Sequence, residues 1–185
     1  MKKLTFTLKS LCAVVLLGLS VGCCSQPKEK IFSNQTYIEM GSPAVLAIPD
    51  GYTSIAAATF ENCDDLTQIT LPASITSIGS KAFYSCDGIT SVVIPQGIAT
   101  IPDNCFYGCD GLTSVRIPSS VTSIEFNAFH GCESLMEIAI PSSVTSIGKD
   151  IFSNCEDGIQ IVVPQCSPLY EQFKAEYGDW IVAAK

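Results

Sequence analysis

The 23 residues CDDLTQITLPASITSIGSKAFYS (63–85) are followed by three further copies of the same pattern, without insertion or deletion. The copies read CDGITSVVIPQGIATIPDNCFYG (86–108), CDGLTSVRIPSSVTSIEFNAFHG (109–131) and CESLMEIAIPSSVTSIGKDIFSN (132–154). A partial copy starts at Cys155, and a degenerate one starts at Met40. A fixed period of this size predicts stacked units, each too small to bury its own apolar face.

Each unit predicts one short strand followed by a turn. Leu66, Ile69 and Leu71 have the spacing L-x-x-L-x-L, in which alternate side chains of a strand point inward. Proline ends each strand because it cannot donate into a parallel ladder, at Pro72, Pro95, Pro118 and Pro141. The second half adds inward aliphatic residues, a short helical or 3₁₀ turn and an inward aromatic at Phe83, Phe106, Phe129 and Phe152. The predicted fold class is an α/β repeat, a solenoid with one parallel β-sheet face.

The two ends of the chain predict a leader and a cap. Residues 1–22 combine lysines with an apolar run too short to anchor a protein in a bilayer, as in a secretory signal peptide. Residues 23–39 are then a polar tether, residues 40–166 the repeats and residues 167–185 a helical cap that ends near Gly178.

Cys23 follows Ser20-Val21-Gly22 in a pattern that resembles a bacterial lipobox. The resemblance implies that Cys23 is lipidated and becomes the new N-terminus, with Cys24 as a second candidate thiol. Attachment to the outer membrane through acyl chains follows from this interpretation. Simple secretion is the alternative.

Net charge excludes two classes of partner. The chain carries 18 acidic and 10 basic residues, a net charge of −8. Cleavage before Cys23 removes three lysines and no acid, which leaves −11. Such a surface repels nucleic acid phosphates and anionic lipid headgroups, so we expect neither as a partner.

The chain has ten cysteines, which in an exported protein would usually indicate disulfides. Five of them recur at one position of the unit and are expected to stack in a column facing the core: Cys63, Cys86, Cys109, Cys132 and Cys155. Their number is odd, and a buried free thiol behaves as a small hydrophobic group. We therefore expect reduced structural cysteines, although a spacing of about 5 Å between coils does not forbid a bridge.

The pattern C-x-x-L-T-x-I-x-I-P-x-S-V-T-S-I-G-x-x-A-F over residues 40–166 resembles the BspA-like, or Treponema-type, leucine-rich repeat. This resemblance implies a right-handed leucine-rich-repeat solenoid. It also implies an exported or surface protein of anaerobic bacteria, in a family of which some members are implicated in adhesion. The family defines a scaffold rather than a catalytic site, so no functional residue is transferred.

Motifs for catalysis and cofactors are missing from the sequence, which shows no glycine-rich phosphate loop, HExxH or nucleophile elbow. The only histidine, His130, is close to Cys132, but that thiol is expected to face the core. One candidate for calcium is the column of acids that follows the cysteines: Asp64, Asp87, Asp110, Glu133 and Glu156. Bonds from backbone N–H groups of their own turns are the alternative, and we expect no enzyme, metal or cofactor.

Two surfaces are candidates for binding. The first is the expected concave sheet face, with outward residues Gln68, Ser91, Val93, Ser114, Arg116 and Glu137. Arginine on a surface of small and mostly uncharged side chains is a suitable anchor for a partner. The second is a convex aromatic column of Tyr84, Tyr107 and His130, which could stack on sugars or proteins or could only cover the core. A solvated sheet face that binds nothing is the alternative.

The sequence thus predicts a monomeric, non-catalytic lipoprotein of the cell envelope that binds a protein or a glycan, as an adhesin does. Whether it faces the cell surface or the periplasm stays open. The alternative is a periplasmic structural or assembly component with no host ligand.

Overall fold

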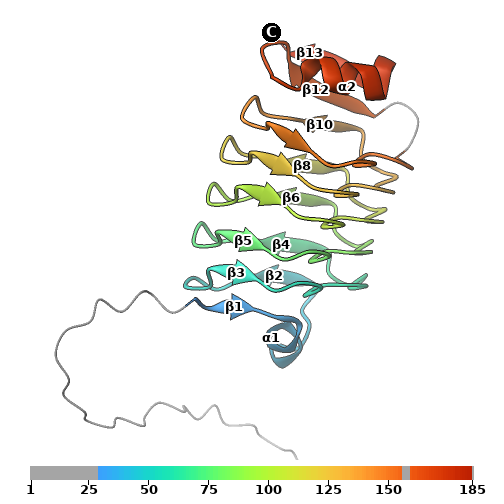
Figure 1. Cartoon of the computed structure of the whole chain (residues 1–185). Helices are drawn as coiled ribbons and strands as arrows, with labels where there is room; N and C mark the ends of the chain where they lie inside the picture. The colour runs from blue at the N-terminus through green and yellow to red at the C-terminus, as the bar shows by residue number, and fades with distance from the viewer. Residues whose placement is uncertain (1–28, 156–158, 185) are drawn as a thin grey trace, which may run out of the picture.

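The structure, a computed structural model, describes residues 29–155 and 159–184. The predicted signal peptide, the lipidation site at Cys23 and the acid Glu156 lie outside the described residues. Short strands stack coil upon coil into a solenoid that ends in a helical cap (Figure 1). Among the described residues, no helix is both long enough and apolar enough to span a membrane.

The first side of each coil forms the parallel sheet that the repeats predict. Its strands pair in the orders β2-β4 and β6-β8-β10-β12-β13, and β4 also contacts β6. Every pair is parallel, and within the repeats equivalent residues 23 positions apart face each other, as Val92 faces Val115, whereas β12 and β13 pair at an offset of 20. The strands are β2 (Val45–Ala47), β4 (Gln68–Thr70), β6 (Ser91–Val93), β8 (Ser114–Arg116), β10 (Glu137–Ala139), β12 (Gln160–Pro164) and β13 (Ile181–Ala184).

A second, narrower parallel ladder occupies another side of the coil. Its two-residue strands pair in the orders β1-β3-β5 and β7-β9-β11. They are β1 (Ile31–Phe32), β3 (Ser54–Ile55), β5 (Ser77–Ile78), β7 (Thr100–Ile101), β9 (Ser123–Ile124) and β11 (Ser146–Ile147). The sequence predicted inward aliphatic residues here, and Ile75 and Ile78 are indeed buried, but it did not predict a ladder.

The third side consists of hydrogen-bonded turns rather than the expected helical or 3₁₀ turns. Two residues of each turn have left-handed backbone, as Lys81 (φ 60°) and Ser85 (φ 49°) do, which prevents a continuous helix. This alternation points N–H groups along the solenoid axis. Lys81, Phe83 and Ser85 donate to the carbonyl groups of Asp103, Cys105 and Tyr107 in the next coil, at 3.1, 2.9 and 2.7 Å.

The core is a stack of equivalent side chains. The rings of Phe60, Phe83, Phe106, Phe129 and Phe152 lie 5.1 to 5.8 Å apart between centroids and nearly parallel. All five are fully buried. Since each ring packs against the ring of the coil above and of the coil below, no coil could bury its aromatic residue alone.

The solenoid begins earlier than residue 40. Strand β1 pairs with β3, and helix α1 (Asn34–Glu39) follows it, capped by the Ser33 hydroxyl, which accepts from the Thr36 N–H. Phe32 and Tyr37 are buried against Phe60, with ring centroids 5.8 and 5.1 Å away. The tether predicted for residues 23–39 therefore includes nine residues, 31–39, that belong to the folded domain.

The predicted helical cap is present. Helix α2 (Tyr170–Tyr177) buries Phe173, ends at Gly178 (φ 52°) and leads through the 3₁₀ turn η1 (Gly178–Trp180) into β13. Strand β13 then pairs with β12 in parallel, so the chain adds one more strand to the sheet after the repeats end.

Candidate functional site

The sheet face, defined as the outward residues of β4, β6, β8 and β10, is exposed as predicted. In each strand the middle residue is buried and its two neighbours are exposed, because side chains alternate along a strand. All six predicted residues point outward: Gln68, Ser91, Val93, Ser114, Arg116 and Glu137.

Parallel register arranges these residues in two rows. Ser91, Ser114 and Glu137 follow one another in the first row, with Gln68 at the equivalent position of β4. Val93 faces Arg116 in the second row, where Ala139 is the equivalent residue of β10. Within its row, Arg116 is thus flanked by Val93 and Ala139, while Glu137 is in the other row.

Arg116 lies between two shallow hollows of the sheet face. One, of about 550 Å³, also involves Ser114, Met136 and Glu137. The other, of about 310 Å³, lies on the opposite side of Arg116 beside Val93. Because Arg116 lines both hollows, a ligand that fills either one would contact this residue.

Sequence reasoning missed Met136, which is 76% exposed beside Arg116. The three preceding units have threonine at this position, and Thr67 and Thr113 donate to backbone carbonyl groups of the coil before, at 3.1 and 2.9 Å. Met136 cannot make this bond. The sequence did contain a signal for this residue, because methionine replaces the threonine of the other units. The replacement loses a hydrogen bond between coils and exposes a large apolar side chain.

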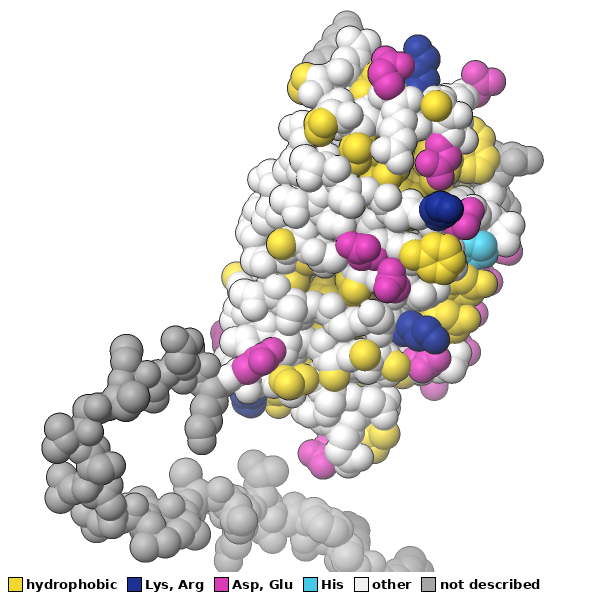
Figure 2. Space-filling view, in the orientation of Figure 1, with side chains coloured by type: hydrophobic (Ala, Val, Ile, Leu, Met, Phe, Trp, Pro, Cys, Tyr) yellow, Lys and Arg dark blue, Asp and Glu magenta, His cyan; other side chains and the backbone are white. Residues whose placement is uncertain are grey.

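The aromatic column of Tyr84, Tyr107 and His130 is also present. The rings of Tyr84 and Tyr107 stack at 4.8 Å and 2°, and those of Tyr107 and His130 at 4.6 Å and 5°. The three side chains are half-buried, and Asn154 Nδ2 lies 3.1 Å from His130 Nε2. Hydrophobic side chains gather along this edge of the solenoid beside the histidine (Figure 2).

This stacking limits what the column can bind. A sugar packs on the open face of an aromatic ring, but the two faces of Tyr107 are covered by its neighbours. The Lys81 ammonium group lies 5.5 Å from the Tyr84 centroid. The column therefore offers ring edges and hydroxyl groups, and its geometry suits the joining of coils better than the stacking of a ligand.

The acidic column lies at the start of each unit. Asp64, Asp87 and Asp110 are exposed, and no group of three or more metal-ligating side chains comes together in the described part of the chain. The pKa of Asp110 is raised, first by partial burial and then by the charges of Asp87 and Glu133. The carboxylates of the coils before and after Asp110 thus add to the effect of burial at this position.

Stacked coils with a parallel ladder and inward columns define a leucine-rich-repeat protein. Residues 28–158 match the family described as BspA type leucine rich repeat region, in six copies. The chain belongs to this family, whose repeats are generally non-enzymatic.

Solved structures of bacterial repeat proteins are similar to the chain. A leucine-rich repeat protein of Treponema pallidum is 28% identical with a TM-score of 0.63, over 68% of this chain and 60% of its own. A leucine rich cell surface protein of Faecalibacterium prausnitzii is 32% identical with a TM-score of 0.52, over 66% of this chain and 38% of its own. A leucine-rich repeat protein of Bacteroides ovatus is 26% identical with a TM-score of 0.56, over 76% of this chain and 42% of its own. The chain thus spans between about two fifths and three fifths of these relatives, and no curated protein matches it.

Proposed function

We propose that the chain is a non-catalytic binding protein of the cell envelope, and that its sheet face captures a protein or glycan through an acidic group held by Arg116. The single observation that carries this proposal is the position of Arg116 between two hollows, in a row of apolar neighbours. Arginine and exposed apolar groups such as Met136 and Val93 are what binding hot spots combine.

An acidic partner group fits this surface better than a basic one. The guanidinium fork binds a carboxylate or sulfate with two hydrogen bonds, and lysine cannot reproduce this geometry. The strongly negative net charge of the chain would slow the approach of such a partner, so affinity must come from close contact at the face rather than from long-range attraction.

The test is a binding screen of the purified chain against immobilised matrix proteins and against sulfated and sialylated glycans, followed by variants of Arg116. On any hit, Arg116→Ala should raise Kd roughly 30-fold, the effect of about 2 kcal/mol at a hot spot. Arg116→Lys should restore only part of the loss. Lys149→Ala, which removes the same charge from an exposed turn position, should bind as the parent does.

Equal capture by the parent and by Arg116→Ala, with unchanged melting temperatures, would remove the sheet face as the binding surface. Melting temperature should not fall in either arginine variant, because the side chain is exposed.

Lipidation at Cys23 and exposure at the cell surface are part of the same proposal. The similarity to a cell surface protein of Faecalibacterium prausnitzii supports the location. Protease treatment of intact cells, with lysed cells as control, should remove the domain if it faces outward. Protection until lysis would favour the alternative, a periplasmic structural or assembly component, and would direct the search for partners to cross-linking within the envelope.

A further inference from the structure

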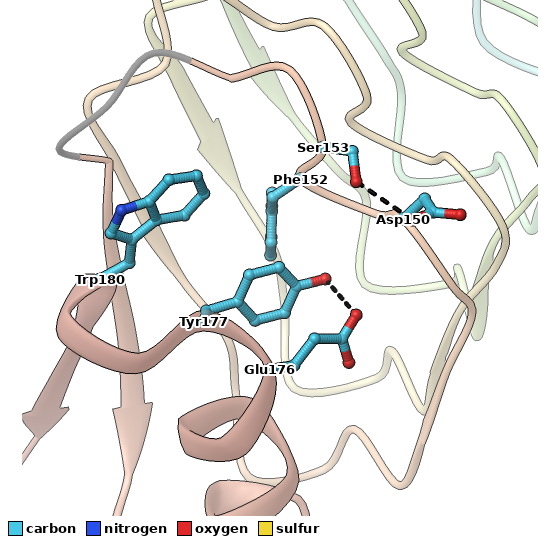
Figure 3. Close-up of a pocket in the computed structure, with 6 residues that line it drawn as sticks. All are labelled: Asp150, Phe152, Ser153, Glu176, Tyr177 and Trp180. Carbon is cyan, nitrogen blue, oxygen red and sulfur yellow. Dashed lines mark hydrogen bonds between the residues drawn. The ribbon is translucent and has the colours of Figure 1, made fainter.

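A pocket of about 360 Å³ opens between the last complete coil and the C-terminal cap (Figure 3). It lies on the turn side of the coil rather than on the sheet face, so the function proposed above makes no use of it. Two carboxylates, three aromatic rings and two hydroxyl groups line it, from Asp150, Phe152, Ser153, Glu176, Tyr177 and Trp180.

The aromatic part of the pocket is fixed by packing. The Tyr177 ring meets the fully buried Phe152 ring edge-on, with centroids 5.6 Å apart and planes at 71°. Tyr177 and Trp180 lie nearly parallel, at 6.2 Å and 17°. Half-buried aromatic rings present negative π-faces and hydrophobic surface at the same time, which attracts an organic cation.

The two carboxylates come from different segments and lie on the hydroxyl side of Tyr177 (Figure 3). Tyr177 donates to Glu176 Oε1 at 2.9 Å, and the Ser153 hydroxyl donates to Asp150 Oδ1 at 3.2 Å. These bonds orient each carboxylate through one oxygen and leave the other oxygen to accept from a ligand. Among the described residues, no lysine or arginine lines the pocket, and its two charged side chains are acidic.

The pKa of Tyr177 is raised in this negative environment. Burial raises its pKa first, followed by its hydrogen bond to Glu176 and by the charges of Glu176 and Asp150. The phenol therefore keeps its proton and remains the donor that holds the Glu176 carboxylate in place.

We propose that this pocket binds an alkylammonium group, the chemistry of a lysine side chain or of a free primary amine. The free carboxylate oxygens would accept from the ammonium N–H groups, and the alkyl chain would lie along Tyr177 and Trp180. A volume of about 360 Å³ is near the small end of ligand pockets, which suits a chain of a few carbon atoms.

The chain supplies its own reporter, because Trp180 is its only tryptophan and lines the pocket. We expect N-acetyl-lysine amide to change the tryptophan fluorescence with saturation, while N-acetyl-norleucine amide, which keeps the butyl chain without the ammonium group, does not. Titration with n-butylammonium separates the two sources: binding of both cations indicates recognition of any alkylamine, and binding of the lysine compound alone indicates a peptide ligand.

Two variants remove charge without changing shape. Asp150→Asn keeps a residue that tolerates the left-handed backbone found there (φ 58°), as Asn104 and Asn127 do at the equivalent positions. Glu176→Gln keeps the acceptor for Tyr177. Each should weaken lysine binding about tenfold, as expected for the loss of one close charge partner. Glu171→Gln, on the same helix but outside the pocket, should bind as the parent does.

Equal responses to the lysine and norleucine compounds would overturn the proposal, because recognition would then be hydrophobic. The absence of any saturable change with either cation, or unchanged affinity in the folded double variant of Asp150 and Glu176, would overturn it as well. Melting temperatures of all variants show whether the fold is retained.

Discussion

Single side chains explain why cysteine occupies the first position of the unit. The thiol of Cys86 donates to the carbonyl of Phe60 at 2.7 Å, and that of Cys109 donates to Phe83 at 2.9 Å. Cysteine is thus small and apolar enough for the core and still supplies a weak donor to the coil before it. The seven cysteines among the described residues are free thiols, as the odd count at this position suggested for the column.

Phe106→Ala tests the core at the residue scale. Phe106 is fully buried between two other rings, so truncation should leave a cavity and lower the free energy of unfolding by about 3–5 kcal/mol. Urea unfolding monitored by circular dichroism measures the change. Phe126→Ala is the matched control, because that ring is 45% exposed and its loss should cost about 0.5 kcal/mol or less. Similar losses in both variants would contradict the inward assignment.

At the scale of single residues, the sequence was sufficient to predict which side chains point inward or outward at the positions that repeat. The inward phenylalanines, four of the five column cysteines and the outward residues around Arg116 followed from the 23-residue period and from strand alternation, whereas Cys63, the first of the column, is only half-buried. The hollows on either side of Arg116 did not follow, because they depend on the sizes of neighbouring side chains such as Met136. The pocket at the cap likewise joins segments that no period relates.

At the scale of the elements, backbone hydrogen bonds join neighbouring coils on up to three sides, and between the coils that contain β4 and β6 they lie on the turn side alone. Two sides are parallel ladders, and the third uses the N–H groups of left-handed turns. The sequence shows the first ladder as alternating residues. A two-residue strand is too short to show a period, and a left-handed residue can be Lys81, Asn104 or Ala58, so the other two sides carry no comparable signal.

The thiol column makes stability depend on alkaline pH. Burial first raises the pKa of Cys109 to about 12 and that of Cys155 to about 11, from an ordinary value of 9.0. The folded state therefore keeps protons that the unfolded chain releases. This contribution is complete below pH 9.0 and is lost as pH rises toward the folded pKa values.

We expect the free energy of unfolding under reducing conditions to fall with pH above 9.0, by about 1.4 kcal/mol per pH unit for each buried thiol. In Cys109→Ala, the free energy of unfolding should fall less steeply with pH, by the contribution of one buried thiol. Urea unfolding at a series of pH values measures this slope. Parallel slopes in the parent and the variant would show that Cys109 does not contribute. Comparison with the variant also cancels the ionisation of other groups.

Glycine is required where coils approach most closely. A Cβ atom on Gly111 would overlap the carbonyl oxygen of Asp87 in the coil before, and one on Gly88 would overlap that of Asp64. The unit that begins at Cys132 has Ser134 at this position, and there the backbone N–H of Ser134 donates to the Asp110 carbonyl at 3.2 Å. Coil spacing therefore adjusts locally, which the sequence period alone does not reveal.

The molecule as a whole must close the two ends of a stack. The N-terminal end of the described solenoid uses an atypical coil: Phe32 and Tyr37 precede Ile55 and Phe60 by 23 residues, so the period continues before residue 40. The C-terminal end uses α2 to cover the core and β13 to extend the sheet. Both terminal elements cover apolar surface that, inside the stack, is covered by the next repeat.

Removal of residues 167–185 tests the cap. The truncated chain exposes the edge of β12 and loses the buried Phe173, so it should associate through its open end and melt at a lower temperature. Size-exclusion chromatography with light scattering, with the full chain as control, measures the association. A truncated chain that stays monomeric and melts like the parent would show that the last coil closes the stack by itself.

The coil-to-coil bonds join residues at a constant offset, and this has a consequence for inheritance. Removing or duplicating 23 consecutive residues between Cys63 and Asn154 brings equivalent positions of neighbouring coils together in the same register. Unequal recombination within the repeated part of the gene would therefore change the height of the protein in steps of about 5 Å and keep the register of the columns. Height is a quantity that selection can tune here while the two terminal closures stay as they are.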